Sequence, residues 1–202
     1  ILIDNLPFWA EFSSTPSTKV SLMSEWESKM KAIVSESSRE NVTSLVGVPS
    51  WMMILLRQAL AYTGKENVLE IWKNLEVYFH GGVSFVPYRD QYKELIPSDN
   101  FRYYETYNAS EGFFAIQDRN NSDEMLLMLD YGIFYEFIPM DTYGTPTQKA
   151  IPLWEVETGK NYAMVITTNA GLWRYQIGDT VRFTSTSPYR IKITGRTKHH
   201  IN

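Results

Sequence analysis

In the first hundred positions, segments whose apolar residues repeat with the period of a helix alternate with segments whose apolar pattern is typical of a strand. The stretch 24–35 carries apolar residues on one helical face and opens with Ser24-Glu25-Trp26-Glu27, a capping-box pattern. A strand at 42–48 and a helix from Pro49 to about Ala61, ended by Gly64, are expected next. Further expected elements are a short helix at 68–72, a strand at 75–80, a helix at 88–95 and a strand at 101–107. This alternation predicts a mostly parallel, helix-covered sheet with ligand groups at the carboxyl ends of its strands.

The pattern changes after Glu111 to short strands separated by turn-rich stretches such as Asn120-Asn121-Ser122-Asp123. The expected strands are 113–117, 125–129, 133–137, 162–167, 182–184 and 191–194. They predict antiparallel sheet or a small β-barrel. The expected fold class is therefore α/β, with an α/β unit at 1–140, a β-rich unit at 141–202 and a boundary within 139–152.

Composition excludes several classes of protein. The 202 residues are 44% hydrophobic, which is ordinary for a globular domain, and the net charge of −4 gives no basic field for nucleic acid. The chain has no cysteine, so disulfides and thiolate metal sites are excluded. The apolar run at 51–56 is too short to span a bilayer, and no signal-peptide pattern opens the sequence. No membrane contact and a cytoplasmic location are expected.

Two segments carry candidate chemistry. One reads Tyr-Asn-Ala-Ser-Glu-Gly at 107–112, and the other reads Leu-Trp-Arg-Tyr-Gln-Ile-Gly-Asp-Thr-Val at 172–181. Each places a single carboxylate, Glu111 or Asp179, beside glycine and aromatic residues after a strand-like segment. Carboxylates in such positions bind a metal ion or ribose hydroxyls, so the two segments predict the halves of one nucleotide site.

Further motifs, taken in their order along the chain, strengthen this hypothesis. They are Gly47-Val48-Pro49-Ser50, His80-Gly81-Gly82, Glu136-Phe137-Ile138-Pro139 and Gly195-Arg196-Thr197-Lys198. With the two segments above, they resemble the auxin-responsive acyl-acid amido synthetases, the Gretchen Hagen family of adenylate-forming ligases. The resemblance implies that this chain forms part of the large domain of such a ligase.

The resemblance also implies regions that this sequence does not contain. The family has a Ser/Thr/Gly-rich phosphate loop upstream of these motifs and a mobile C-terminal domain after a hinge that would fall near 201–202. Neither is present in the sequence. We therefore expect the chain to be the central part of a larger enzyme, partnered by these two regions and inactive without them.

The implied activity consumes ATP with Mg²⁺. A small carboxylic acid is joined to the α-phosphate, and the acyl group then passes to an amino acid to form an amide. Two alternatives stay open: an acyl-CoA ligase that shares the adenylation step, and a noncatalytic ligand-binding module of the same fold.

The resemblance assigns roles around the first segment. Glu111 would be the catalytic Mg²⁺ ligand, Tyr107 would pack against adenine, and Thr106 and Ser110 would supply hydrogen bonds. A core tyrosine and a solvated turn glutamate are the structural alternatives.

On the strand before it, Gly81 and Gly82 would let the backbone approach adenine, since glycine has no Cβ. His80 and residues near Val48 would contact the acyl substrate. The structural alternatives are that Gly81 and Gly82 form a simple turn and that His80 satisfies a buried hydrogen bond.

In the second segment, Asp179 would accept hydrogen bonds from the ribose hydroxyls, because one carboxylate can accept both. Arg196 would reach ribose or phosphate through its fixed donor fork. Arg174 and Tyr175 are expected to brace the segment.

Other chemistries lack their defining residues. His199 and His200 do not predict a zinc site, because adjacent residues of an extended chain point to opposite faces. Gly-x-Ser-x-Gly, Gly-x-Gly-x-x-Gly and the Walker loop are absent. The sequence therefore argues against three other functions: a hydrolase, a Rossmann dehydrogenase and a P-loop kinase.

Overall fold

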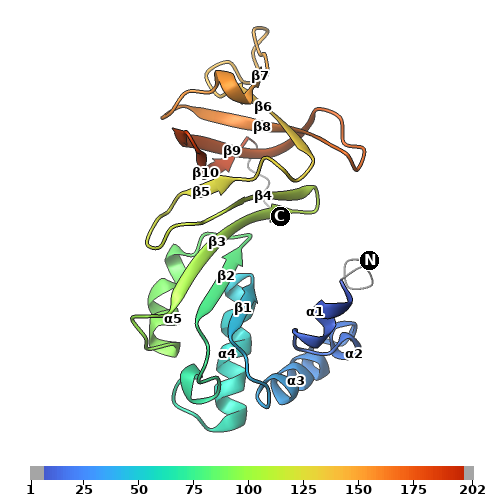
Figure 1. Cartoon of the computed structure of the whole chain (residues 1–202), viewed down its shortest axis with the longest axis vertical. Coiled ribbons are helices and arrows are strands. Elements are labelled where there is room, and N and C mark those ends of the chain that lie inside the picture. Colours follow the sequence, from blue (N-terminus) through green and yellow to red (C-terminus); the bar gives the residue numbers. More distant parts are fainter. Residues whose placement is uncertain (1–6, 198–202) are drawn as a thin grey trace. The chain divides into compact units, whose positions relative to one another are not determined.

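The structure of the chain is a computed structural model that describes residues 7–197 (Figure 1). It divides into two compact units, Ile1–Tyr103 and Tyr104–Asn202. This division lies well before the boundary expected within 139–152, because the strands that follow residue 104 pack into the same core as the later ones. The predicted α/β class is confirmed, and each unit is described in turn.

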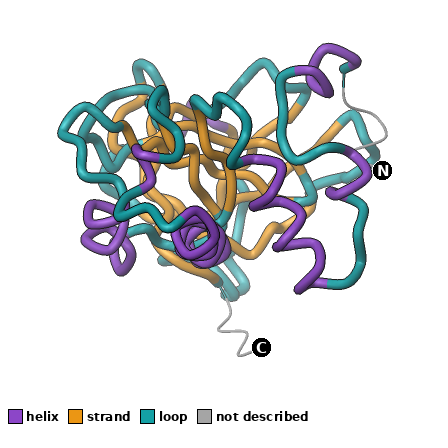
Figure 2. The backbone as a smooth tube through the Cα atoms, turned by 90° about the horizontal axis from the view of Figure 1, so that it is seen from below, coloured by secondary structure: helices purple, strands orange, loops and turns teal. Residues whose placement is uncertain are grey.

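All the α-helices of the described residues belong to unit 1. Figure 2 shows helices in purple and strands in orange along the backbone. The elements of unit 1 are α1 (Phe8–Phe12), α2 (Thr18–Ser21), α3 (Trp26–Ser37), β1 (Ser44–Gly47), α4 (Pro49–Thr63), η2 (Val68–Glu70), β2 (Val77–Gly81), η3 (Val86–Tyr88) and α5 (Arg89–Leu95). Strands β1 and β2 pair in parallel, with Gly47 opposite His80. The carboxyl ends of both strands therefore lie side by side, as the sequence predicted.

Local chemistry sets the helix ends of unit 1. Helix α4 begins with Pro49, whose fixed φ suits the first turn, and it ends at Gly64 with φ +67°, a left-handed cap. Helix α3 begins at Trp26 rather than at 24, because the Glu25 side chain accepts hydrogen bonds from the backbone N–H groups of Glu27 and Ser28. Glutamate, not the expected serine, is thus the N-cap.

Unit 2 is an antiparallel sheet. Its strands are β3 (Arg102–Ala109), β4 (Gly112–Ile116), β5 (Met125–Leu127), β6 (Ile133–Pro139), β7 (Ile151–Pro152), β8 (Asn161–Thr168), β9 (Tyr175–Thr186) and β10 (Tyr189–Arg196), with the short helix η4 (Leu153–Glu155) after β7. Hydrogen-bonded neighbours run β3-β4-β5-β10-β9-β8-β6-β7. Strand β9 is much longer than the 182–184 predicted, so Asp179 lies within a strand rather than in a turn.

The sheet of unit 2 curls around its core. Strands β3 and β9 lie four strand spacings apart in the order, about 19 Å in a flat sheet. Yet the side chains of Tyr107 on β3 and Asp179 on β9 are hydrogen-bonded at 2.8 Å. The strand order is open, and the strong curl encloses a core that contains Phe114, Phe137 and Phe183.

No helix among residues 7–197 is long and apolar enough to cross a bilayer.

Candidate functional site

Asp179 lies where β9 departs from regular pairing. Between Val165, which pairs with Gln176, and Ala163, which pairs with Thr180, β9 has three residues against one on β8. Gly178 adopts φ +92°, in the left-handed region that favours glycine. Its carbonyl accepts a hydrogen bond of 2.8 Å from the backbone N–H of Thr197. The bulge and this hydrogen bond fix the backbone that presents Asp179.

Two side chains hold the Asp179 carboxylate. The Tyr107 hydroxyl donates to Oδ2 at 2.8 Å, and the Arg196 Nε lies 3.0 Å from Oδ1. Arg196 stands opposite Asp179 on β10 and leaves 65% of its side chain exposed, whereas the Asp179 side chain is 13% exposed. A carboxylate has about four acceptor positions, so about two stay available for a ligand's hydroxyl groups.

Tyr107 is a buried donor. Only 5% of the residue is exposed, and its ring packs against Phe114 with the centroids 5.0 Å apart. Burial, and then the Asp179 carboxylate, raise the pKa of Tyr107 far above its usual value, so the phenol stays protonated. The structure therefore places the predicted adenine-packing residue in the core, with its hydroxyl on the predicted ribose ligand.

Ser110 and Glu111 form the tip of the β3–β4 hairpin, since Ala109 pairs with Gly112 across them. Ser110 is exposed and Glu111 is half-buried. On β3, the Thr106 hydroxyl lies 3.4 Å from the Asn108 side-chain oxygen. Within residues 7–197 no group of three or more His, Asp or Glu side chains converges as a metal site.

In unit 1, the predicted residues of the acyl and adenine side gather at the ends of β1 and β2. Val48 follows β1 as the residue before α4, and Gly81 ends β2. Gly82 comes next with φ +80°, and a Cβ built there would lie 3.4 Å from Val48 Cγ2. The structure thus brings Val48 and Gly82 together, while Thr106, Tyr107, Ser110, Glu111, Asp179 and Arg196 belong to unit 2.

His80 is buried in an aromatic cluster. It is 3% exposed and stacks on Phe85 with ring centroids 4.1 Å apart, and Tyr78 lies 5.5 Å away. Burial, followed by the charge of Arg89, lowers the pKa of His80 to about 4. His80 is therefore neutral at pH 7.

The buried His80 predicts acid sensitivity of unit 1. Because the pKa falls from 6.5 to about 4 on folding, the unfolded chain binds more protons between these values. Stability is complete above pH 6.5 and falls as the pH decreases toward 4. Lowering the pH from 7 to 5 should cost about 2 kcal/mol through this residue, measured by urea unfolding of the chain. A His80→Gln variant should lack this part of the pH dependence of the unfolding free energy. An equal pH dependence in the variant and the parent chain would refute the prediction.

Arg174 braces the start of β9, as expected. Its Nε and one terminal nitrogen donate to the two Glu136 carboxylate oxygens at 2.9 and 3.0 Å, and its backbone N–H donates to Thr167 Oγ1 at 3.0 Å. These bonds hold Arg174 at φ +44°, a conformation that a non-glycine residue rarely adopts. No hydrogen bond or ion pair of Tyr175 connects it to this brace among the described residues.

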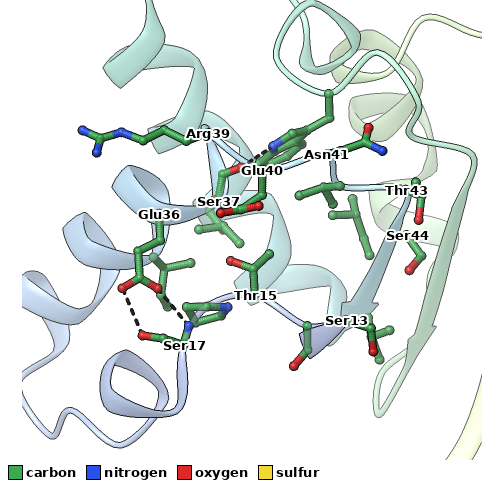
Figure 3. Close-up of a pocket in the computed structure, with 18 of the residues that line it drawn as sticks. Ser13, Thr15, Ser17, Glu36, Ser37, Arg39, Glu40, Asn41, Thr43 and Ser44 are labelled. Atoms are coloured by element: carbon green, nitrogen blue, oxygen red, sulfur yellow. Dashed lines mark hydrogen bonds between the residues drawn. The ribbon is translucent and has the colours of Figure 1, made fainter. Parts of the chain in front are cut away.

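A cavity of about 1030 Å³ opens in unit 1 between the segment 12–18 and the elements α3, β1 and α4 (Figure 3). Glu36 accepts hydrogen bonds from the Ser17 backbone N–H at 2.8 Å and from its hydroxyl at 3.0 Å. None of Val48, His80, Gly81 and Gly82 lines this cavity. This cavity is therefore separate from the predicted site residues of unit 1.

Sequence reasoning missed the hydroxyl of Tyr107 as a partner of Asp179 and Glu136 as the partner of Arg174. Both pairs join residues far apart in the chain, 72 and 38 positions, so no local pattern connects them. Lys198, His199 and His200 lie outside the described residues.

Comparisons with known proteins identify the family. The GH3 family N-terminal domain matches residues 1–101, and the GH3 family central domain matches residues 126–196. Indole-3-acetic acid-amido synthetase GH3.4 of Arabidopsis thaliana is 28% identical over 172 residues, which are 78% of this chain and 26% of the relative. The chain spans about a quarter of the length of the curated relatives it matches.

Solved structures show the same fold at low sequence identity. GH3.15 acyl acid amido synthetase superposes with a TM-score of 0.68 at 14% identity, covering 90% of this chain and 42% of that chain. An open conformation of 2-hydroxyisobutyryl-CoA ligase, in complex with 2-HIB-AMP and CoA, superposes with a TM-score of 0.64 at 15% identity, covering 87% and 41%.

Proposed function

Because the chain belongs to the GH3 family, we propose that it forms the central part of an ATP-dependent ligase that adenylates a small carboxylic acid and transfers the acyl group to an amino acid. The observation that supports this most directly is the Asp179 carboxylate. It is fixed from two sides and retains acceptor positions, as a ribose ligand requires.

The proposed reaction has two steps. A carboxylate oxygen of the acid attacks the α-phosphorus of ATP, the bond to the β-phosphate oxygen breaks, and pyrophosphate leaves. The amine of the acceptor then attacks the acyl carbonyl, loses a proton, and expels AMP. The chain's task in the first step is to hold the nucleotide so that the attacking oxygen lies in line with phosphorus.

We assign the ribose and the phosphates of the nucleotide to residues of unit 2. Asp179 binds the ribose hydroxyls, and Arg196 contributes donors to ribose or phosphate. Thr106, Tyr107 and Ser110 belong to the same nucleotide site. Val48, His80, Gly81 and Gly82 of unit 1 are assigned to the acyl group and adenine.

Glu111 fits the role of Mg²⁺ ligand. Its carboxylate is partly exposed at a hairpin tip and has no hydrogen-bond or ion-pair partner in the described part of the chain. Mg²⁺ commonly takes only one or two protein carboxylates together with substrate phosphates. The ion offsets phosphate charge when bound, while the chain supplies one anchoring oxygen.

A Glu111→Gln change in the full-length polypeptide that contains this chain should raise the Mg²⁺ concentration for half-maximal activity by about tenfold, since it removes one anionic ligand. A metal titration of pyrophosphate exchange measures this shift. Glu155→Gln, at an exposed glutamate of the same unit, is the matched control. An unaltered titration for Glu111→Gln would remove the assignment.

Acid-dependent ATP/pyrophosphate exchange on the full-length polypeptide tests the proposed function. Small aromatic and aliphatic acids serve as the panel. Exchange with any of them establishes adenylation. A folded protein that supports none favours a noncatalytic module of this fold.

The structural likeness to a CoA ligase keeps thioester formation as the second candidate. Supplying the adenylated protein with amino acids or with coenzyme A distinguishes the two, because the products differ in mass. A reducing compartment suits a chain without cysteine, and we include a cytoplasmic location in the proposal.

A further inference from the structure

The hydrogen bond between Tyr107 and Asp179 joins two strands that are not neighbours. Tyr107 lies on β3 and Asp179 on β9, and β4, β5 and β10 separate these strands in the sheet order. The contact exists because the sheet curls. It therefore depends on tertiary structure and fixes Asp179 relative to the hairpin that carries Glu111.

Burial makes this hydrogen bond consequential. Both residues are less than a tenth exposed, so water cannot readily replace the phenol as a donor to Oδ2. A hydrogen bond to an ionised acceptor is stronger than a neutral one. The phenol is a donor throughout the physiological pH range, because the pKa of Tyr107 is far above it.

The two donors on Asp179 differ in character. Arg196 is mostly exposed, on a flexible side chain, and its ion pair is open to solvent on one side. The Tyr107 ring is locked in the core against Phe114. Of the two, Tyr107 is thus the rigid restraint on the rotation of the carboxylate about its Cβ–Cγ bond.

The ring of Tyr107 offers little area to a bound base. With 5% of the residue exposed, both ring faces are largely covered by protein. The hydroxyl, in contrast, touches the residue that we assign to the ribose. Its geometry supports action through Asp179 rather than direct stacking on adenine.

We propose that Tyr107 is a positioning residue, whose hydroxyl orients the Asp179 carboxylate so that its remaining acceptor positions face the ribose hydroxyls. This inference rests on the proposed function, because the ribose role of Asp179 belongs to it. It assigns a separate and testable task to one oxygen atom.

The test is a Tyr107→Phe variant of the full-length polypeptide, which removes the hydroxyl and keeps the ring. Ribose binding contributes alike to ground and transition states, so KM for ATP should rise about tenfold with kcat changed much less. A residue that only stacks on adenine would leave KM unchanged in this variant.

Tyr135→Phe is the matched control. Tyr135 is buried in the same core, and its hydroxyl donates to the Met128 carbonyl at 3.0 Å, so the change removes the same atom from a similar setting. Its KM for ATP should stay within about twofold of the parent protein. Equal shifts in both variants would indicate a loss of packing and overturn the proposal.

A double-mutant cycle separates positioning from a structural role. The dissociation constant of ATP, measured by calorimetry, should rise in Tyr107→Phe but should not change when the same substitution is added to Asp179→Ala. A full effect that persists in the Asp179→Ala background would contradict the proposal.

The two proposals fail differently. Absence of acid-dependent exchange in the parent protein counts against the ligase function, while ATP affinity still reports on Tyr107. Exchange in the parent with no change of ATP affinity in Tyr107→Phe refutes the positioning role alone. A folded parent protein that binds no ATP refutes both.

Discussion

Replacing Asp179 by alanine in the full-length polypeptide is expected to lower kcat/KM for ATP in acid-dependent exchange by about 100- to 10,000-fold. In the proposed role the change removes two hydrogen bonds to ribose hydroxyls, and each bond to an ionised group contributes about 1.5–3 kcal/mol. It also deprives the buried Tyr107 hydroxyl of its acceptor. The measurement is pyrophosphate exchange at varied ATP concentration.

Two variants control this result. Asp130→Ala removes an exposed aspartate of the same unit and should leave exchange unchanged. Asp179→Asn keeps the side-chain shape and one acceptor oxygen, so its loss should be smaller than that of alanine. Unchanged kinetics in Asp179→Ala, with the protein folded by circular dichroism, would withdraw the ribose assignment.

The second large effect concerns stability. Asp118→Ala should lower the free energy of unfolding of unit 2 by about 3 kcal/mol, because it leaves the buried Arg190 guanidinium without its counter-charge. The Arg190 side chain is 5% exposed, and both of its terminal nitrogens donate to the Asp118 carboxylate, one of them at 2.8 Å. These hydrogen bonds lower the pKa of Asp118. Urea unfolding of the chain at pH 7 measures the loss.

The chain contains its own control for this prediction. Asp123 pairs with Lys192 at 2.7 Å. Asp123 lies between β4 and β5, as Asp118 does, and Lys192 lies on β10, as Arg190 does. The Asp123 side chain, however, is 79% exposed, and exposed pairs contribute at most about 1 kcal/mol. Asp123→Ala should therefore have a much smaller effect. Similar losses in the two variants would show that burial does not govern the Asp118 pair.

Local sequence predicted the elements of unit 1 because their signals are short in range. Pro49 and Gly64 mark the two ends of α4, and the expected parallel pairing of the strands that end at Gly47 and near His80 is confirmed. The start of α3 was wrong by two residues, since Glu25 competes successfully with Ser24 for the first free N–H groups. Such competition between adjacent polar residues depends on backbone geometry that a pattern does not contain.

The long strand β9 was predicted only in part. Its first half reads Tyr175-Gln176-Ile177-Gly178-Asp179, where glycine and aspartate favour a turn by propensity. Pairing with β8 on one side and β10 on the other overrides that preference, and the extra residues form a bulge. Tertiary pairing thus made a strand of a segment that reads locally as a turn.

The sequence by itself determined the family, the α/β class and the candidate carboxylates, because motif order and residue type are properties of the chain. Tertiary structure alone decided what those carboxylates touch. Asp179 meets Tyr107 because a curled sheet brings β3 and β9 together, and the solvent-exposed Asp118 pairs with a buried Arg190. Burial and contact across 72 positions depend on how the strands pack in space, which no local pattern specifies.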